Sequence, residues 1–240
     1  MEKYIPEYVA PLFTAAGAMG DRSEQQDAWD TFRRPARQAR ADLGTPRQAH
    51  LVVVADGMGG YPNGAEAARA AVAACGDRWK RMPRGTPMME TFADIFHAAH
   101  VAAETAGGGV ALTAVWLHAK VLIADVAWSG DVKAFRLSPK GIRAETKPHR
   151  LAYRKNALTS HLGVRNGGGA FEHVRWGLNP GRSIVVATDG AWDVEGLDVA
   201  VVMTWAPETR AKLLVELAMR LGEVSTPGKR DNGTAVVVSR

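Results

Sequence analysis

The sequence predicts an α+β fold in which strands and helices are grouped rather than alternating. Short apolar, β-branched runs bounded by Gly, Pro, Asp or Asn recur along the chain, as is typical of strands. The clearest runs are Leu51–Ala55, Ala111–Leu117, Val121–Ala127, Val132–Leu137, Ile184–Ala187 and Ala235–Val238. Two helical patterns lie together after the first run, and a third lies near the C-terminus. This grouping favours layers of sheet and helix over a doubly wound sheet.

Several predicted strands are joined by short links. Residues 138–141 have the composition of a turn, and a further strand is predicted at Ile142–Thr146. Since short links join antiparallel neighbours, the strands between residues 111 and 146 are expected to form one antiparallel meander.

Three stretches carry apolar residues at helical spacing. They run from Ala65 to Trp79, from Met89 to Ala103 and from Leu213 to Leu221. Glycines follow the second and third stretches, as expected where helices end.

Composition fits a single globular domain spanning residues 1–240, with 46% hydrophobic and 23% charged residues. The net charge of +5 is too small an excess to indicate nucleic-acid binding by itself. The one cysteine, Cys75, cannot form an internal disulfide, so a reducing, cytoplasmic location is expected. No apolar stretch reaches the ~20 residues of a membrane helix, and the N-terminus, with Glu2 and Pro6, lacks the pattern of a signal peptide.

Residues 33–49 form a basic segment that is expected to be a long loop, extending over Thr31–Gln48. Its arginines are Arg33, Arg34, Arg37, Arg40 and Arg47, and Pro35 and Pro46 lie among them. The loop is either a solvated surface or a contact surface for phosphate or an acidic partner.

Four aspartates lie at the ends of apolar strands. Asp56 and Asp189 each follow a strand and precede a glycine, whereas Asp131 and Asp231 come before strands. Each could be a turn residue, but packed strands can bring their ends together. Carboxylates gathered in one place repel each other unless a cation neutralises them. Oxygen ligands without a matching His or Cys set indicate Mg²⁺ or Mn²⁺ rather than zinc.

These aspartates lie in motifs that resemble, in the same order, those of the metal-dependent Ser/Thr protein phosphatases of type 2C in their bacterial form. Residues 54–60 read Val-Ala-Asp-Gly-Met-Gly-Gly and resemble the core signature of that family. The other matching segments are 22–28, 129–135, 188–193 and 231–234. The resemblance covers the chain from about Gly20 to the C-terminus.

The resemblance implies an αββα sandwich with a metal site at one end of two antiparallel sheets. Asp56 would bridge two Mn²⁺ or Mg²⁺ ions, with the Gly57 carbonyl as a further ligand. Asp189 and Asp231 would hold the first ion, and Asp131 with Asp189 would line a third, looser site. Arg22 would bind the substrate phosphate as a bidentate fork.

The implied activity is hydrolysis of phosphoserine and phosphothreonine on proteins by a hydroxide that bridges the metals. The expected partners are a phosphorylated protein and the Ser/Thr kinase that the enzyme opposes, without membrane or nucleic-acid binding, and the expected state is a monomer.

The sequence departs from the family pattern at several positions. Gln26 stands where the family has a glutamate that helps bind the second metal, and Pro148-His149 stands where Asp-His is common. An amide ligates without adding negative charge, so the affinity for the second metal is expected to be lower. The alternative function is therefore a catalytically weak phosphatase fold that binds phosphoproteins.

Two other kinds of catalytic or metal site have partial signals in the sequence. Cys75 and Arg81 match the Cys-x5-Arg spacing of cysteine phosphatases, but Cys75 lies within a helical, Ala-rich pattern where a core residue is expected. His97 and His100 are spaced for one helix face, but no second ligand pair indicates zinc.

Overall fold

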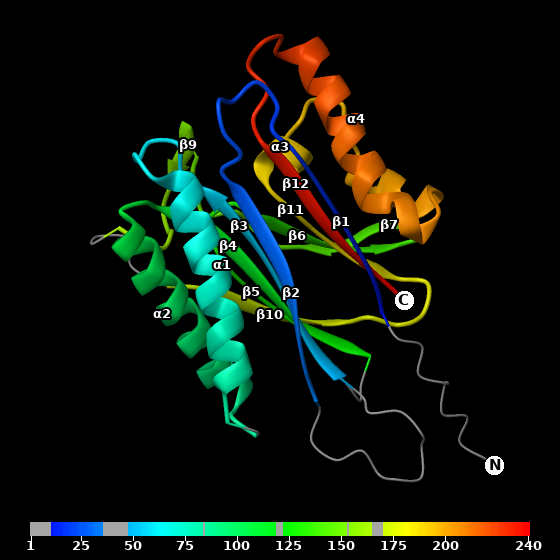
Figure 1. Cartoon of the computed structure of the whole chain (residues 1–240). Helices are drawn as coiled ribbons and strands as arrows, with labels where there is room; N and C mark the ends of the chain where they lie inside the picture. The colour runs from blue at the N-terminus through cyan, green and yellow to red at the C-terminus, as the bar shows by residue number, and fades with distance from the viewer. Residues whose placement is uncertain (1–10, 36–47, 84, 119–121, 153, 165–169) are drawn as a thin grey trace, which may run out of the picture.

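The chain folds into four layers, with two β-sheets packed face to face between layers of helix (Figure 1). The computed structural model describes residues 11–35, 48–83, 85–118, 122–152, 154–164 and 170–240. One sheet has the order β1-β12-β11-β6-β7 and the other β10-β5-β4-β3-β2. Neighbouring strands are antiparallel in both sheets, so the predicted α+β, αββα class is confirmed.

The strand bounds follow the predicted apolar runs and add several strands. The first sheet holds β1 (Leu12–Ala18), β12 (Gly233–Ser239), β11 (Ser183–Ala187), β6 (Lys133–Ser138) and β7 (Gly141–Glu145). The second holds β10 (Glu172–Gly177), β5 (Ile123–Ser129), β4 (Val110–Leu117), β3 (Gln48–Gly57) and β2 (Asp27–Pro35). A separate pair is formed by β8 (Arg150–Leu151) and β9 (Arg154–Leu158). Val121, where one strand was predicted to begin, lies outside the described residues.

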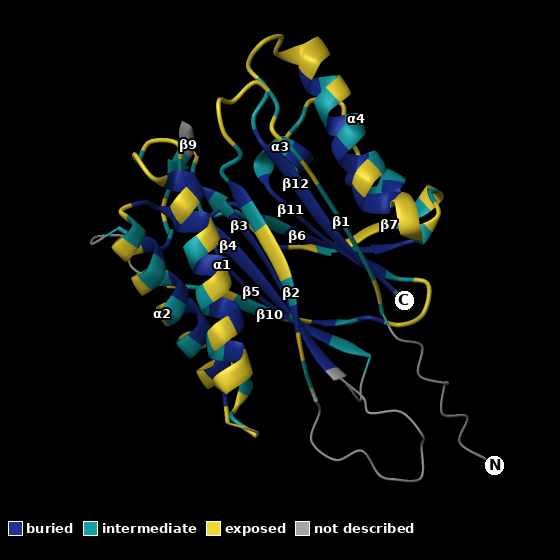
Figure 2. Cartoon of the chain, in the orientation of Figure 1, coloured by how far each residue is buried: buried dark blue, intermediate teal, exposed yellow. Residues whose placement is uncertain are grey.

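The predicted helices are confirmed. They are α1 (Gly64–Arg81), α2 (Met88–Ala106) and α4 (Arg210–Ser225), and shorter turns are α3 (Asp189–Trp192), η2 (Val199–Thr204) and η3 (Pro207–Thr209). The first two cover the second sheet, and their outer faces are exposed (Figure 2). Helix α4 covers the first sheet. Among the helices of the described residues, none is both long and apolar enough to cross a membrane.

Strand β3 lies at the centre of the packing. Leu51, Val53 and Ala55 pack toward α1 and α2, whereas Val52 and Val54 pack toward the other sheet. All five are fully buried, which explains why this run is continuously apolar instead of alternating.

The predicted single meander is wrong. Strand β5 pairs with β4 in one sheet and β6 pairs with β7 in the other, so the chain changes sheets between Ser129 and Lys133. Gly130 permits this crossing with a φ of +99°, and a Cβ there would lie 2.4 Å from the Cβ of Ala111. Short links favour antiparallel pairing, but here the need to bury both sheets against each other overrides that preference.

The prediction of a basic loop over residues 33–49 is wrong at both ends of the segment. Arg33 and Arg34 belong to β2, and Gln48 begins β3. The guanidinium of Arg34 lies 4.5 Å from the ring centroid of Trp79 and donates to the Trp79 and Met82 carbonyls. Residues 36–47, with Arg37, Arg40 and Arg47, lie outside the described residues.

A buried charge network joins β5 to β10 away from the aspartates singled out above. The Asp125 side chain is fully buried, and its oxygens lie 2.5 Å from His118 Nε2, 2.9 Å from His173 Nε2 and 2.8 Å from Arg175 Nε. Burial alone would raise the pKa of Asp125, but the hydrogen bonds from His118, Arg175 and His173 outweigh it and hold the pKa well below its usual value of 3.8.

We expect Asp125→Asn to lower the free energy of unfolding by about 2 kcal/mol at pH 7, because it removes charge-assisted hydrogen bonds from a buried group. Since the pKa is depressed in the folded protein, this contribution is present above pH 3.8 and disappears as the pH falls further. Urea unfolding at pH 7 and below pH 3.8 measures it, with exposed Asp77→Asn as control. An equal effect of Asp125→Asn at both pH values would contradict the role of the charge.

Candidate active site

The two sheets are joined at one end by a hydrogen bond between buried side chains. Thr188, which follows β11, donates from Oγ1 to Asp27 Oδ2 at 2.9 Å, and Asp27 begins β2 in the other sheet. Thr188 also bonds to the backbone of Thr234 in β12, with its amide donating to the Thr234 carbonyl. Residues that follow or precede these strands are therefore held at a common edge.

Asp27 and Asp56 are register partners on β2 and β3. Burial raises the pKa of Asp27 to about 7, and it raises the pKa of Asp56 well above its usual value, with the charge of Asp27 adding to the effect. Asp27 Oδ1 is buried and has no hydrogen-bond partner among the residues that the structure describes. Two neighbouring carboxylates, one with an unsatisfied oxygen, form a place where a cation would be stabilised.

The other predicted aspartates join them. Asp189, Asp131 and Asp231 all raise the pKa of Asp56 through their charges. Partial burial, together with Asp131 and Asp231, also raises the pKa of Asp189 to about 7. The structure thus brings together all four aspartates that the sequence analysis singled out.

Glycines allow the strand ends to approach so closely. A Cβ on Gly57 would lie 2.2 Å from the Gly64 carbonyl oxygen, and one on Gly190 would lie 2.1 Å from the Asn232 carbonyl oxygen. Each glycine directly follows one of the aspartates, Asp56 or Asp189, so the Asp-Gly pairs serve close backbone contact as well as turning the chain.

Arg22 and Gln26 lie at the rim of the cluster. Arg22 Nη2 donates to Asp231 Oδ2 at 2.5 Å, and its side chain remains 47% exposed. The side-chain amide of Gln26 donates from Nε2 to Glu24 Oε1 at 3.2 Å. A Cβ on Gly59 would lie 3.3 Å from Arg22 Nη1 and 3.2 Å from Gln26 Oε1. Arg22 and Gln26, both predicted as site residues, therefore lie beside Gly59 in the segment that follows Asp56.

Three residues of the site were not assigned from the sequence. Asp27 and Asp193 lie within the family-like motifs, and their place in those motifs was an available signal. Arg150 follows Pro148-His149 and lies among Asp131, Asp189 and Asp193, with which it forms ion pairs. Its cationic side chain departs from the acidic pattern, so no sequence signal pointed to it.

The cluster holds more negative than positive charge. Six carboxylates face two guanidiniums, and Arg22 and Arg150 between them bind Asp231, Asp131, Asp189 and Asp193. As the side chains stand in the described part of the chain, no three potential ligands surround a single point. The donor set of hard oxygens, the raised pKa values and the unpartnered Asp27 oxygen nevertheless fit divalent cations, provided that Asp231 turns from Arg22.

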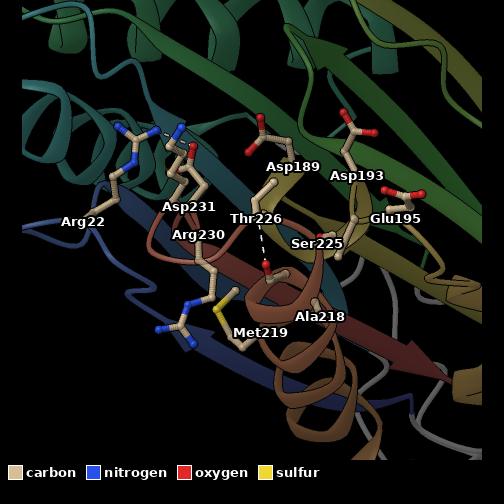
Figure 3. A pocket seen from close by; sticks show the side chains of 14 residues that line it. Arg22, Asp189, Asp193, Glu195, Ala218, Met219, Ser225, Thr226, Arg230 and Asp231 are labelled. Atoms are coloured by element: carbon tan, nitrogen blue, oxygen red, sulfur yellow. Dashed lines mark hydrogen bonds and ion pairs between the residues drawn. The ribbon is translucent and has the colours of Figure 1, made fainter.

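A pocket of about 710 Å³ opens beside Asp189 and Asp231 (Figure 3). Arg22 lies at one end, and Asp193 and Glu195 lie at the other. Met219 in the C-terminal part of α4 and Thr226, which follows the helix, form a wall. Acidic groups thus meet an exposed guanidinium at the mouth of an open cavity, an arrangement suited to an anionic substrate held near bound cations.

Cys75 and His100, which the sequence offered as parts of a thiol or a zinc site, have structural surroundings. Cys75 is fully buried in α1, and burial raises the pKa of its thiol to about 12, so it is not a nucleophile. His100 Nδ1 accepts a hydrogen bond from the Gly163 amide, which gives this histidine a structural partner.

Comparisons with known proteins bear on the fold and the family of the chain. Solved structures that resemble the chain include a serine/threonine phosphatase of S. agalactiae (TM-score 0.76, 20% identity, 96% of this chain and 99% of the other). Another is the serine/threonine phosphatase Stp1 of Staphylococcus aureus (TM-score 0.76, 17% identity, 100% of this chain and 99% of the other). A third is the catalytic domain of PstP, solved in complex with two manganese ions (TM-score 0.70, 20% identity, 95% of this chain and 97% of the other). These likenesses establish the fold.

The search of curated proteins finds no match. The family model of protein phosphatase 2C matches residues 23–212, which include Gln26, Asp56, Asp131, Arg150 and Asp189. The chain therefore belongs to the protein phosphatase 2C family.

Proposed function

We propose that this protein phosphatase hydrolyses phosphoserine and phosphothreonine on proteins and depends on two divalent ions, Mn²⁺ or Mg²⁺, the ions that its family uses. The observation that carries the proposal is the acidic cluster around Asp56, which lies beside the exposed guanidinium of Arg22. Carboxylates alone would repel a phosphate, whereas bound cations and an arginine would attract it.

The proposed ligands are the residues at the strand ends. Asp56 would contact both ions with the Gly57 carbonyl beside it, and Asp189 and Asp231 would complete the site of the first. Bound divalent ions would supply Lewis acidity, which activates water for attack on phosphorus and offsets charge on the phosphate oxygens. Asp27, held by Thr188, would keep Asp56 in place.

Arg22 is proposed to receive the substrate phosphate. Its ion pair with Asp231 is exposed, so a phosphate can displace the carboxylate at little cost. The guanidinium fork matches two phosphate oxygens, and the displaced Asp231 becomes free to bind a cation. Substrate and metal binding are therefore expected to strengthen each other.

Gln26 is proposed to be a neutral contact of the second ion. Its side-chain Nε2 lies 3.2 Å from Glu24 Oε1, so a carboxylate lies beside Gln26. The amide adds no charge, so the second ion is expected to bind less tightly than the first.

The substrate segment is proposed to lie in the pocket between Asp189 and α4. Lys229 and Arg230 line it together with Arg22, although Arg230 is already paired with Asp21 and Glu223. Substrate proteins are expected to be targets of a Ser/Thr kinase.

The direct test is hydrolysis of p-nitrophenyl phosphate and of a phosphothreonine peptide with Mn²⁺, and then with EDTA. We expect turnover with Mn²⁺ and its loss with EDTA. Binding of the phosphopeptide without any Mn²⁺-dependent turnover would favour the alternative, a module that recognises phosphoproteins.

Asp56→Asn is expected to lower kcat by about 1000-fold, as loss of a central electrostatic group does. It should also raise the Tm of the metal-free protein, because it removes a carboxylate whose charge is unfavourable there. Mn²⁺ should then raise the Tm less than in wild type. Thermal unfolding and steady-state kinetics measure both effects.

Cys75→Ser is the matched control, with kcat near that of wild type. A catalytically inactive Cys75→Ser variant together with an active Asp56→Asn variant would overturn the metal-site proposal.

Arg22→Lys should lower kcat/KM for the phosphopeptide by about 10- to 100-fold, because a single ammonium replaces the bidentate fork. Arg81→Lys, at the far end of α1, should leave kcat/KM unchanged. An unchanged value for Arg22→Lys would show that Arg22 does not bind the phosphate.

A further inference from the structure

Arg150 gathers three carboxylates of the active site around one guanidinium. Its Nε lies 2.8 Å from Asp131 Oδ2, its Nη2 lies 2.9 Å from Asp189 Oδ2, and its Nη1 lies 2.5 Å from Asp193 Oδ2. The Nη2 atom also lies 2.8 Å from Asp131 Oδ2, so all three nitrogens are engaged. One cation of this chain thus occupies the space that these carboxylates share.

The position of Arg150 is fixed by its neighbours. The preceding residue, His149, donates its amide to the Gly130 carbonyl and accepts from the Gly130 amide at Nδ1. The Trp192 ring lies 5.0 Å from the guanidinium carbon, and its Nε1 donates to the Asp131 carbonyl. The Arg150 side chain is only 12% exposed. It is therefore held as part of the site and is not a mobile surface arginine.

Arg150 divides the acidic cluster into two parts. Asp131, Asp189 and Asp193 share the buried cation of Arg150, and Asp231 has the exposed Arg22. Asp27 and Asp56 form no ion pair with any residue that the structure describes. A divalent ion needs free carboxylate oxygens. On the Asp131 side, the Oδ2 atom of each carboxylate is already bonded to a charge that cannot be removed by deprotonation.

We infer that Arg150 takes the place of a third divalent ion and limits this site to two. Arg150 is a positioning residue: it holds Asp189 toward the ions at Asp56 and keeps Asp131 and Asp193 from binding an ion of their own. The inference rests on the proposed metal dependence, and it replaces the looser third site that the family resemblance led us to expect at Asp131.

The test is a count of bound Mn²⁺ by equilibrium dialysis, with free Mn²⁺ measured by its EPR signal. Wild type should bind two ions per chain. Arg150→Ala and Arg150→Gln should bind three, because both remove the charge, whereas Arg150→Lys and the distant control Arg81→Ala should bind two. Adding Asp131→Asn to Arg150→Ala should return the count to two.

A wild-type count of three would overturn the inference, and so would a count of two in folded Arg150→Ala or Arg150→Gln. If both variants fail to fold, Asp131→Asn alone decides: it should still bind two ions, and loss of an ion would contradict the assignment of Asp131 to Arg150. A wild type that binds no Mn²⁺ would contradict the proposed function instead, which keeps the two failures distinct.

Discussion

The site is governed by repulsion among carboxylates that two sheets force together at one end. Each carboxylate loses hydration as the strand ends meet, and the pKa values of Asp27, Asp56 and Asp189 rise for that reason. A protein would gain stability by replacing some of these groups. In the proposed function, bound cations offset this cost, as is common where function and stability conflict.

The fold contributes the convergence itself. Strands β3 and β11 come from different sheets, yet Asp56 at the end of β3 and Asp189 after β11 lie at the same edge because Thr188 and Asp27 bond across the interface. The change of sheet at Gly130 brings Asp131 to the same place. The crossing that broke the expected meander is therefore also what completes the acidic cluster.

The sequence predicted much of this architecture because the apolar runs and helical patterns are long and clear. Strand β3 was identified from its apolar run and helices α1, α2 and α4 from their helical spacing, and the four strand-end aspartates were expected to meet. Sequence reasoning did not predict which sheet β6 joins, because pairing partners depend on tertiary packing rather than on local pattern. Nor could it predict Arg150, because a single arginine has no spacing signal and its role arises only when β8 lies beside Asp131, Asp189 and Asp193.

We propose that metal ions neutralise the Asp56 side of the cluster while Arg150 neutralises the other side. Crystals grown with Mn²⁺ and measured at the manganese absorption edge test it most directly. We expect two anomalous peaks beside Asp56, with the Arg150 guanidinium still between Asp131 and Asp193. A manganese peak at the guanidinium position, or no peak beside Asp56, would contradict it.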